Sequence, residues 1–217
     1  RMVSKEITSE MKSVGEIMAL GRSFEEVMQK GLRMLQVGMH GFVANEDIQI
    51  DVDKIENDIS HPTPKRILVI AEALKRGWTV EKISKISGID KWFLDKLKNI
   101  VDMSKRIEQA KNHIDKETMR TAKKIGFSDK QIGFLTKKTE LEVRTERKKF
   151  GILPAIKQID TLAAEYPAST NYLYMTYHGN TNDVVPGKKK KAIVLGSGAY
   201  CIGSSVEFDW CCVNAVQ

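Results

Sequence analysis

The feature that most constrains the fold of this chain is an internal repeat of eleven residues. Gly77-Trp-Thr-Val-Glu-Lys-Ile-Ser-Lys-Ile-Ser87 matches Gly126-Phe-Ser-Asp-Lys-Gln-Ile-Gly-Phe-Leu-Thr136 position by position. In each copy a glycine ends a helical stretch, an aromatic residue follows, and a hydroxyl residue is placed to cap a second, short helix. The repeat therefore predicts helix pairs joined by tight turns, which pack into a compact helical domain.

The helical pattern around the repeat runs from Pro64 to about Arg147. Pro64 suits the first turn of a helix that Gly77 closes. Between the two copies, residues 91–110 carry apolar side chains at helical spacing and predict a longer amphipathic helix. Residues 45–61 are acidic and polar, and they predict a loop or a weak helix.

Capping boxes mark three helix starts, one of them within the second copy of the repeat. Ser23 is placed to cap a helix that extends to about Val37, and Glu26 is expected to reach back to the Ser23 amide. The other two boxes are Ser128 with Gln131, and Thr139 with Glu142.

Both ends of the chain show the pattern of α/β structure. Residues 13–20 predict a strand, and a strand followed by one helix needs further partners to bury both faces. Residues 172–177 alternate as an extended segment does, and residues 192–195 predict a short buried strand that enters the turn Gly196-Ser-Gly198. We therefore expect a mainly α fold, with a helical domain flanked by partial α/β segments at both termini, excised from a larger protein.

The net charge of +7 raises the question of nucleic-acid binding. The repeat resembles a helix-turn-helix, but acidic residues interleave with its lysines, and Trp92 and Phe93 are expected in the core rather than on a recognition surface. The basic run Lys188–Lys191 is interpreted as a solvated loop. A standalone helical adaptor or a helix-turn-helix-like nucleic-acid-binding module is kept as the alternative function.

Composition argues against membrane and metal-binding classes. No apolar run approaches the ~20 residues of a membrane span, and no signal peptide opens the chain. The three cysteines (Cys201, Cys211 and Cys212) lack a Cys-x-x-Cys pair, and the four histidines lie far apart. We expect no metal site, no membrane partner, and reduced thiols in a cytosolic-type compartment.

Two polar features near the ends remain open to a functional or a structural interpretation. Gly196-x-Gly198 follows a predicted strand as a phosphate-binding loop would, but a tight turn for strand–helix packing explains it equally well. Glu16 and Glu207 lie in apolar surroundings, where a carboxylate is paired, hydrated or functional. A paired structural carboxylate is the favoured interpretation from the residues alone.

In combination, these motifs resemble the middle of the large subunit of carbamoyl phosphate synthetase, and the likeness runs essentially from end to end. It is carried by Met11-Lys-Ser-Val-Gly-Glu-Ile-Met-Ala-Leu-Gly-Arg22, Ile89-Asp-Lys-Trp-Phe-Leu94, Gly126-Phe-Ser-Asp129, Gln158-Ile-Asp-Thr-Leu-Ala-Ala-Glu-Tyr-Pro167, Tyr172-Leu-Tyr-Met-Thr-Tyr177 and Val194-Leu-Gly-Ser-Gly198 through Gly203-Ser-Ser-Val-Glu-Phe-Asp209. One departure is Ala199, where the family usually has proline.

The resemblance implies an ATP-dependent ligase with two homologous ATP-grasp halves, which makes carbamoyl phosphate from bicarbonate, ammonia or glutamine, and ATP, for arginine and pyrimidine synthesis. It implies that residues 1–40 close the first half, that residues 41–186 form the helical oligomerisation domain with its trailing extended segment, and that residues 187–217 open the second half. No catalytic, cofactor-binding or metal residue is expected within the chain. ATP, Mg²⁺ or Mn²⁺, and K⁺ would be bound by other parts of the parent enzyme.

The same resemblance implies a role in channelling. Met11, Glu16, Ser205 and Glu207 match positions that line the tunnel for carbamate between the two halves. The implied partners are other parts of the same large subunit, a glutaminase subunit or domain, and a second copy through the helical domain, with no nucleic acid. The implied compartment is cytoplasmic, or mitochondrial for an ammonia-dependent parent.

Overall fold

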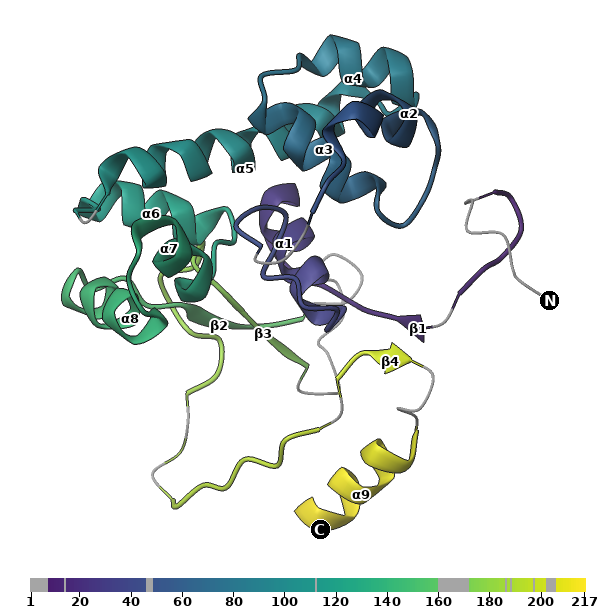
Figure 1. The fold of residues 1–217 in the computed structure, drawn as a ribbon. Coiled ribbons are helices and arrows are strands. Elements are labelled where there is room, and N and C mark those ends of the chain that lie inside the picture. Colours follow the sequence, from purple (N-terminus) through teal and green to yellow (C-terminus); the bar gives the residue numbers. More distant parts are fainter. Residues whose placement is uncertain are drawn as a thin grey trace.

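The computed structural model has a helical body from which the two ends of the chain extend on one side (Figure 1). It describes residues 8–13, 15–45, 49–111, 113–159, 172–185, 187, 189–196, 198–201 and 206–217. Among these, the backbone alone is described at residues 200, 201 and 206–208.

Helices α1 to α8 form the helical body, as the periodic pattern predicts. They are α1 (Phe24–Met34), the 3₁₀ turn η1 (Val52–Lys54), α2 (Ile55–Ser60), α3 (Arg66–Lys75), α4 (Val80–Ser87), α5 (Lys91–Ala110), α6 (Lys116–Lys124), α7 (Asp129–Thr136) and α8 (Glu140–Lys149). The long helix α5 is central because it contacts α1, α3, α4, α6 and α7. Its stripe of Leu94, Leu97, Ile100 and Ile107 is at most 3% exposed, so this stripe forms the middle of the core.

The two copies of the repeat have the same backbone geometry. Gly77 and Gly126 adopt φ of 87° and 94°, and the amide of the following aromatic residue bonds to a carbonyl five residues earlier at 3.0 Å in both copies. Thr79 and Ser128 then cap α4 and α7 with their side-chain oxygens. The helix–turn–helix pairs predicted from the repeat are confirmed.

Two of the three predicted capping boxes are reciprocal. Ser128 and Thr139 each accept from the backbone three residues on, and the Gln or Glu at that position bonds back. In the third, Ser23 caps α1, but the Glu26 carboxylate accepts from the Arg22 amide at 2.8 Å rather than from the Ser23 amide. That detail of the prediction is wrong, because the Glu26 carboxylate turns toward the Arg22 amide and Lys30.

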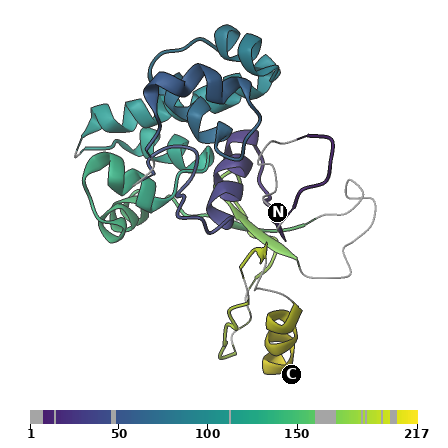
Figure 2. The ribbon, with the colours of Figure 1, turned by 45° about the vertical axis from the view of Figure 1, so that its right-hand side comes forward.

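Two small antiparallel sheets accompany the helices. Strand β2 (Ala155–Gln158) pairs with β3 (Leu173–Thr176) in the register Ala155 with Thr176, and β1 (Gly15–Glu16) pairs with β4 (Tyr200–Cys201). The extended segment predicted at residues 172–177 is confirmed, whereas β2 was not predicted. Figure 2 shows the β2–β3 hairpin beside α1, below the helices.

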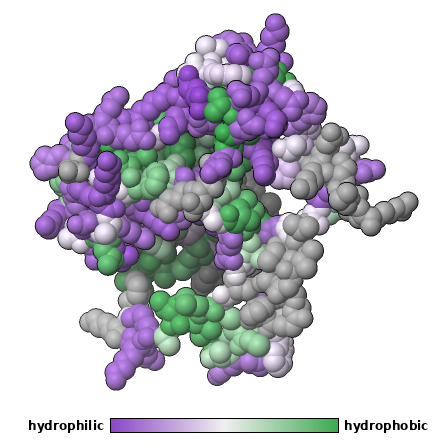
Figure 3. Space-filling model, in the orientation of Figure 1, coloured by the Kyte–Doolittle hydropathy of each residue, from purple (hydrophilic) through white to green (hydrophobic). Residues whose placement is uncertain are grey.

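The C-terminal segment differs most from the prediction. Residues 192–195 are not a buried strand, since Ile193 and Leu195 are each 86% exposed. The physical reason is that the described chain places no neighbouring strand beside them, and a buried strand requires one. The final helix, α9 (Val206–Val216), lies apart from the helical body, and apolar side chains gather over this part of the surface (Figures 1 and 3).

Candidate functional site

The two ends of the chain meet where β1 pairs with β4. Glu16 lies opposite Tyr200, and Gly15 lies opposite Cys201. The expected tunnel residues Met11 and Glu16 both belong to this N-terminal edge, and both are exposed. The pairing places the N-terminal edge directly against the segment that precedes α9 (Figure 1).

For the other two expected tunnel residues, the structure describes the backbone of one and nothing of the other. Ser205 lies outside the described residues, and Glu207 lies in the first turn of α9 with its side chain outside the description.

A hollow of about 360 Å³ adjoins the β1–β4 junction, with Glu16 among its lining residues. Gly198 lies against the end of the Gln36 side chain, so the segment before β4 contacts the residues that follow α1. The hollow is lined by Glu16, Ile17, Met18, Met34, Gln36, Gly198 and Ala199.

Lys30 on α1 joins three segments near this junction. Its ammonium group donates to the carbonyls of Leu20 and Met175 and to the Glu26 carboxylate, each at 2.7 Å. Leu20 follows β1, and Met175 lies in β3. A single cation therefore links the N-terminal edge, α1 and the β2–β3 hairpin.

Glu26 is the anionic partner at the centre of this contact. Its side chain is 2% exposed, and it accepts from Lys30 and from the Arg22 amide. The Nε2 atom of His178, just beyond β3, lies 3.8 Å from the carboxylate and 2.9 Å from the carbonyl of Lys124. A buried carboxylate needs such partners, so Glu26 fixes the geometry of α1 against the hairpin.

A second polar cluster lies inside the helical body between α6, α7 and α8. Asp129 accepts from Lys123 Nζ at 2.8 Å and from Arg147 Nη2 at 2.8 Å, and its three-residue cluster is at most 9% exposed. Lys123 also donates to the Phe127 carbonyl at 2.6 Å, and Arg147 donates to the Ile152 carbonyl at 2.8 Å. These bonds join three helices and the two turns that follow α6 and α8.

The charges of this cluster are strongly perturbed. Burial lowers the pKa of Lys123 to about 8, although Asp129 opposes the shift. Burial alone would raise the pKa of Asp129, but the hydrogen bonds from Arg147 and Lys123 outweigh it and hold that pKa below its ordinary value. Asp129 is therefore ionised at neutral pH, and it compensates two buried cations.

Tyr177 covers the cluster from the hairpin side. Lys123 Nζ lies 4.9 Å from its ring centroid, and the Arg147 guanidinium carbon lies 5.5 Å from it. Burial raises the pKa of the Tyr177 phenol. The residue just beyond β3 thus packs on the ionic core of the helical body.

A third set of contacts fastens α1 to α7. Gln131 Nε2 donates to Gln29 Oε1 at 2.8 Å, and Arg33 donates to the Gly126 carbonyl at 2.9 Å. Burial lowers the pKa of Arg33 to about 10. The packing partners that α1 needs are therefore supplied within the chain by α7 and the turn before it.

Sequence reasoning did not identify Lys30, Lys123 or Arg147. A signal was present for Lys123, because it lies on the same helical stripe as the buried residues Met119 and Ala122. A lysine on a buried stripe requires an anion, but its partner comes from the next helix and cannot be read from spacing.

The surface around the repeat corrects one expectation. Trp92 and Phe93 are not core residues, since they are 52% and 45% exposed and contact the Phe24 ring edge-on and tilted, at ring-centroid distances of 5.5 Å. The reason is that α5 turns its Leu94 side, rather than these rings, toward the core. Nearby lysines are paired locally: Lys96 lies 3.9 Å from Glu25, and Lys82 lies over the Trp78 ring at 3.5 Å.

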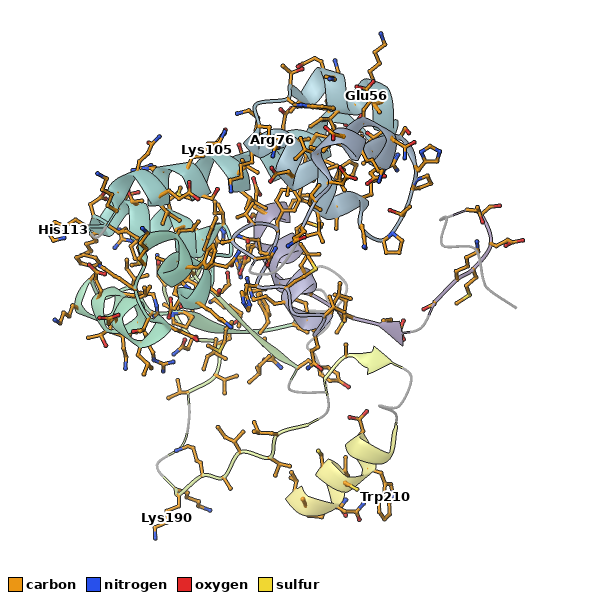
Figure 4. All side chains as sticks on the ribbon, viewed as in Figure 1. Glu56, Arg76, Lys105, His113, Lys190 and Trp210 are labelled. Atoms are coloured by element: carbon orange, nitrogen blue, oxygen red, sulfur yellow. The ribbon has the colours of Figure 1, made fainter. Side chains whose placement is uncertain are left out.

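The basic run lies on the surface, away from the helical body (Figure 4). Lys189–Lys191 are exposed, and the labelled Lys190 lies far from the helical body (Figure 4). Within the described ranges, no helix has the length and apolar character needed to cross a membrane. Over the same residues, no group of three or more His, Cys, Asp or Glu side chains could hold a metal ion.

Comparison with known proteins gives matches over almost the whole chain. A family model described as the oligomerisation domain of the carbamoyl-phosphate synthetase large chain matches residues 16–151, and one described as the carbamoyl phosphate synthase preATP-grasp domain matches residues 188–217.

Three relatives illustrate the degree of similarity. The multifunctional protein pyr1-3 of Dictyostelium discoideum is 50% identical over 99% of this chain and 10% of its own length. The mitochondrial arginine-specific carbamoyl phosphate synthase large chain of Neurospora crassa is 48% identical over 99% of this chain and 18% of its own. The mitochondrial carbamoyl-phosphate synthase (ammonia) of Rattus norvegicus is 46% identical over 99% of this chain and 14% of its own. The chain thus spans between a tenth and a fifth of the length of these relatives.

Proposed function

Because this chain belongs to the oligomerisation-domain family of carbamoyl-phosphate synthetase large chains, we propose that it joins the two active units of an ATP-dependent ligase. The parent enzyme would make carbamoyl phosphate from bicarbonate, ammonia or glutamine, and ATP. The two units would phosphorylate bicarbonate and carbamate in turn, and the chain itself would perform neither step. The observation that carries this proposal is the pairing of β1 with β4, which brings the two ends of a helical domain to one place.

We propose that the β1–β4 junction helps to carry carbamate between the two units. Met11, Glu16, Ser205 and Glu207 are proposed to line part of the carbamate path. Support comes from the exposed Glu16, which is among the lining residues of a hollow between the two ends. Such a path must exclude bulk water, and its acidic groups can hydrogen-bond the intermediate or influence its protonation.

The division of the chain is part of the proposal. Residues 1–40 would close the first unit, residues 41–186 would form the helical domain, and residues 187–217 would open the second unit. The match of the preATP-grasp model at residues 188–217 supports the last boundary. The oligomerisation model begins upstream of the first boundary, at residue 16.

Cofactors, partners and compartment are proposed from the family alone. ATP, Mg²⁺ or Mn²⁺, and K⁺ would be held by other parts of the large chain, and the described residues here offer no cluster of ligands for a metal. The partners would be those other parts, a glutaminase subunit or domain, and a second copy of the helical domain. The compartment would be the cytoplasm or the mitochondrion, since the names of some relatives describe them as mitochondrial.

The alternative of a nucleic-acid-binding module is not favoured. The relatives are carbamoyl-phosphate synthases and multifunctional proteins, and the lysines around the repeat are interleaved with acidic residues.

The experiment that tests this function compares the isolated chain with the full-length protein that contains it. We expect the full-length protein to hydrolyse ATP in a bicarbonate-dependent reaction and to form carbamoyl phosphate when ammonia is added. The isolated chain should do neither at the same molar concentration. Turnover by the isolated chain, or none by the full-length protein, would contradict the proposal.

A further inference from the structure

The side chain of Lys30 has a bonding pattern that a surface lysine does not have. An ammonium group has three donors, and here each one reaches an acceptor at 2.7 Å. Two of these acceptors are backbone carbonyls from segments far apart in the sequence, at Leu20 and Met175. A lysine that only solubilised α1 would not order its long side chain between two other segments.

The two carbonyls belong to segments that lead to the two ends of the chain. Leu20 connects β1 to α1, and Met175 lies in β3, from which the chain continues toward β4. The neighbouring contact from Arg22 Nε to the Tyr174 hydroxyl, at 3.3 Å, spans the same two segments. The N-terminal edge is therefore fixed against β3 at Lys30, in addition to its pairing with β4.

The buried carboxylate explains why a cation is required at this position. The Glu26 side chain is 2% exposed and forms an ion pair with Lys30. Replacement of Lys30 by an apolar residue would leave Glu26 without this cation and both carbonyls without their donor. The direct link between α1, Leu20 and Met175 would then be lost.

We propose that Lys30 is a positioning residue that fixes the N-terminal edge against the β2–β3 hairpin, so that the intermediate made by the first unit is delivered to the path toward the second. This inference rests on the proposed function, since it assumes that the N-terminal edge closes the first active unit. Lys30 touches no reacting group, and its effect is exerted through the placement of the Leu20 and Met175 segments.

The test uses the full-length protein with Lys30→Met, Lys30→Arg and the control Ile83→Val. Ile83 is buried in α4, and Ile83→Val lowers the stability of the helical body without touching the edges. Three quantities are measured: bicarbonate-dependent ATP hydrolysis, ATP formation from ADP and carbamoyl phosphate, and the overall synthesis of carbamoyl phosphate. They are measured at a temperature where all variants are folded by circular dichroism.

We expect Lys30→Met to keep both partial reactions within about twofold and to lose about tenfold in overall synthesis, because intermediate that is not delivered along the path is lost to bulk water. Lys30→Arg should recover part of this loss, since it retains a cation with several donors. Ile83→Val should leave all three rates unchanged.

Two results would overturn the inference. One is a Lys30→Met enzyme with the wild-type rate of overall synthesis. The other is a Lys30→Met enzyme whose partial reactions fall as much as its overall synthesis, together with an equal fall in Ile83→Val, which would give Lys30 a stabilising role alone. Failure of the proposed function would be distinguishable, because the wild-type protein itself would then form no carbamoyl phosphate.

Discussion

Replacement of Asp129 by asparagine should destabilise the helical body more than any exposed charge change. Asp129 compensates Lys123 and Arg147, and all three side chains are at most 9% exposed. Removal of one partner from a buried ion cluster leaves uncompensated charge and costs about 3–5 kcal/mol. For a chain of this size, such a loss lowers the melting temperature by about 10 °C.

The assay is equilibrium urea unfolding at pH 7, followed by far-ultraviolet circular dichroism, for wild type, Asp129→Asn and the matched control Asp102→Asn. Asp102 pairs with Lys98 on the surface of α5, where both side chains are about half exposed. Such pairs contribute about 0–1 kcal/mol, so the control should stay close to wild type. If Asp129→Asn lost no more stability than Asp102→Asn, the inferred cost of the buried cluster would be refuted.

Two further predictions concern the same helices. The pKa of Lys123 is about 8 in the native chain and 10.5 in the unfolded chain, so the unfolded state binds more protons between these pH values. The unfolding free energy of wild type relative to Lys123→Met should therefore rise with pH across that window, by up to about 1.4 kcal/mol per pH unit. A flat or falling difference would contradict the assignment. Gly126→Ala should cost more stability than Gly77→Ala, although both glycines have positive φ. The reason is that a Cβ atom at Gly126 would lie 2.9 Å from the Glu26 backbone, whereas one at Gly77 would meet nothing within 4 Å. Thermal unfolding of the two alanine variants measures the difference, and equal losses would show that the contact with α1 is unimportant.

The helical body could be predicted from the sequence because its signals are local. Helix starts at Thr79, Ser128 and Thr139 depend on caps within three residues, and the glycines of the repeat close the preceding helices. These interactions require no knowledge of distant parts of the chain.

The strands and the polar clusters depend on partners that are distant in sequence. β2 has no pattern of its own and forms because residues 172–177 lie beside it, while residues 192–195 have a strand-like pattern and remain exposed without a neighbour. The contacts of Lys30 and Asp129 likewise join separate helices and strands. Glu16 and Glu207 stand out in the sequence as carboxylates in apolar surroundings, but the tunnel role of Met11, Glu16, Ser205 and Glu207 was assigned only through the family resemblance.

The central proposal is that this segment couples two reactions without performing either of them. It is tested most directly by the ratio of ATP hydrolysed to carbamoyl phosphate formed, measured in the full-length protein with Ser205→Phe and, as a control, Ser60→Phe at an exposed position of α2. Because a phenyl ring at residue 205 would obstruct the proposed path, we expect that ratio to rise while bicarbonate-dependent ATP hydrolysis continues, and the control to keep the wild-type ratio. A Ser205→Phe enzyme with the wild-type ratio and the wild-type rate of carbamoyl phosphate formation would contradict the proposal.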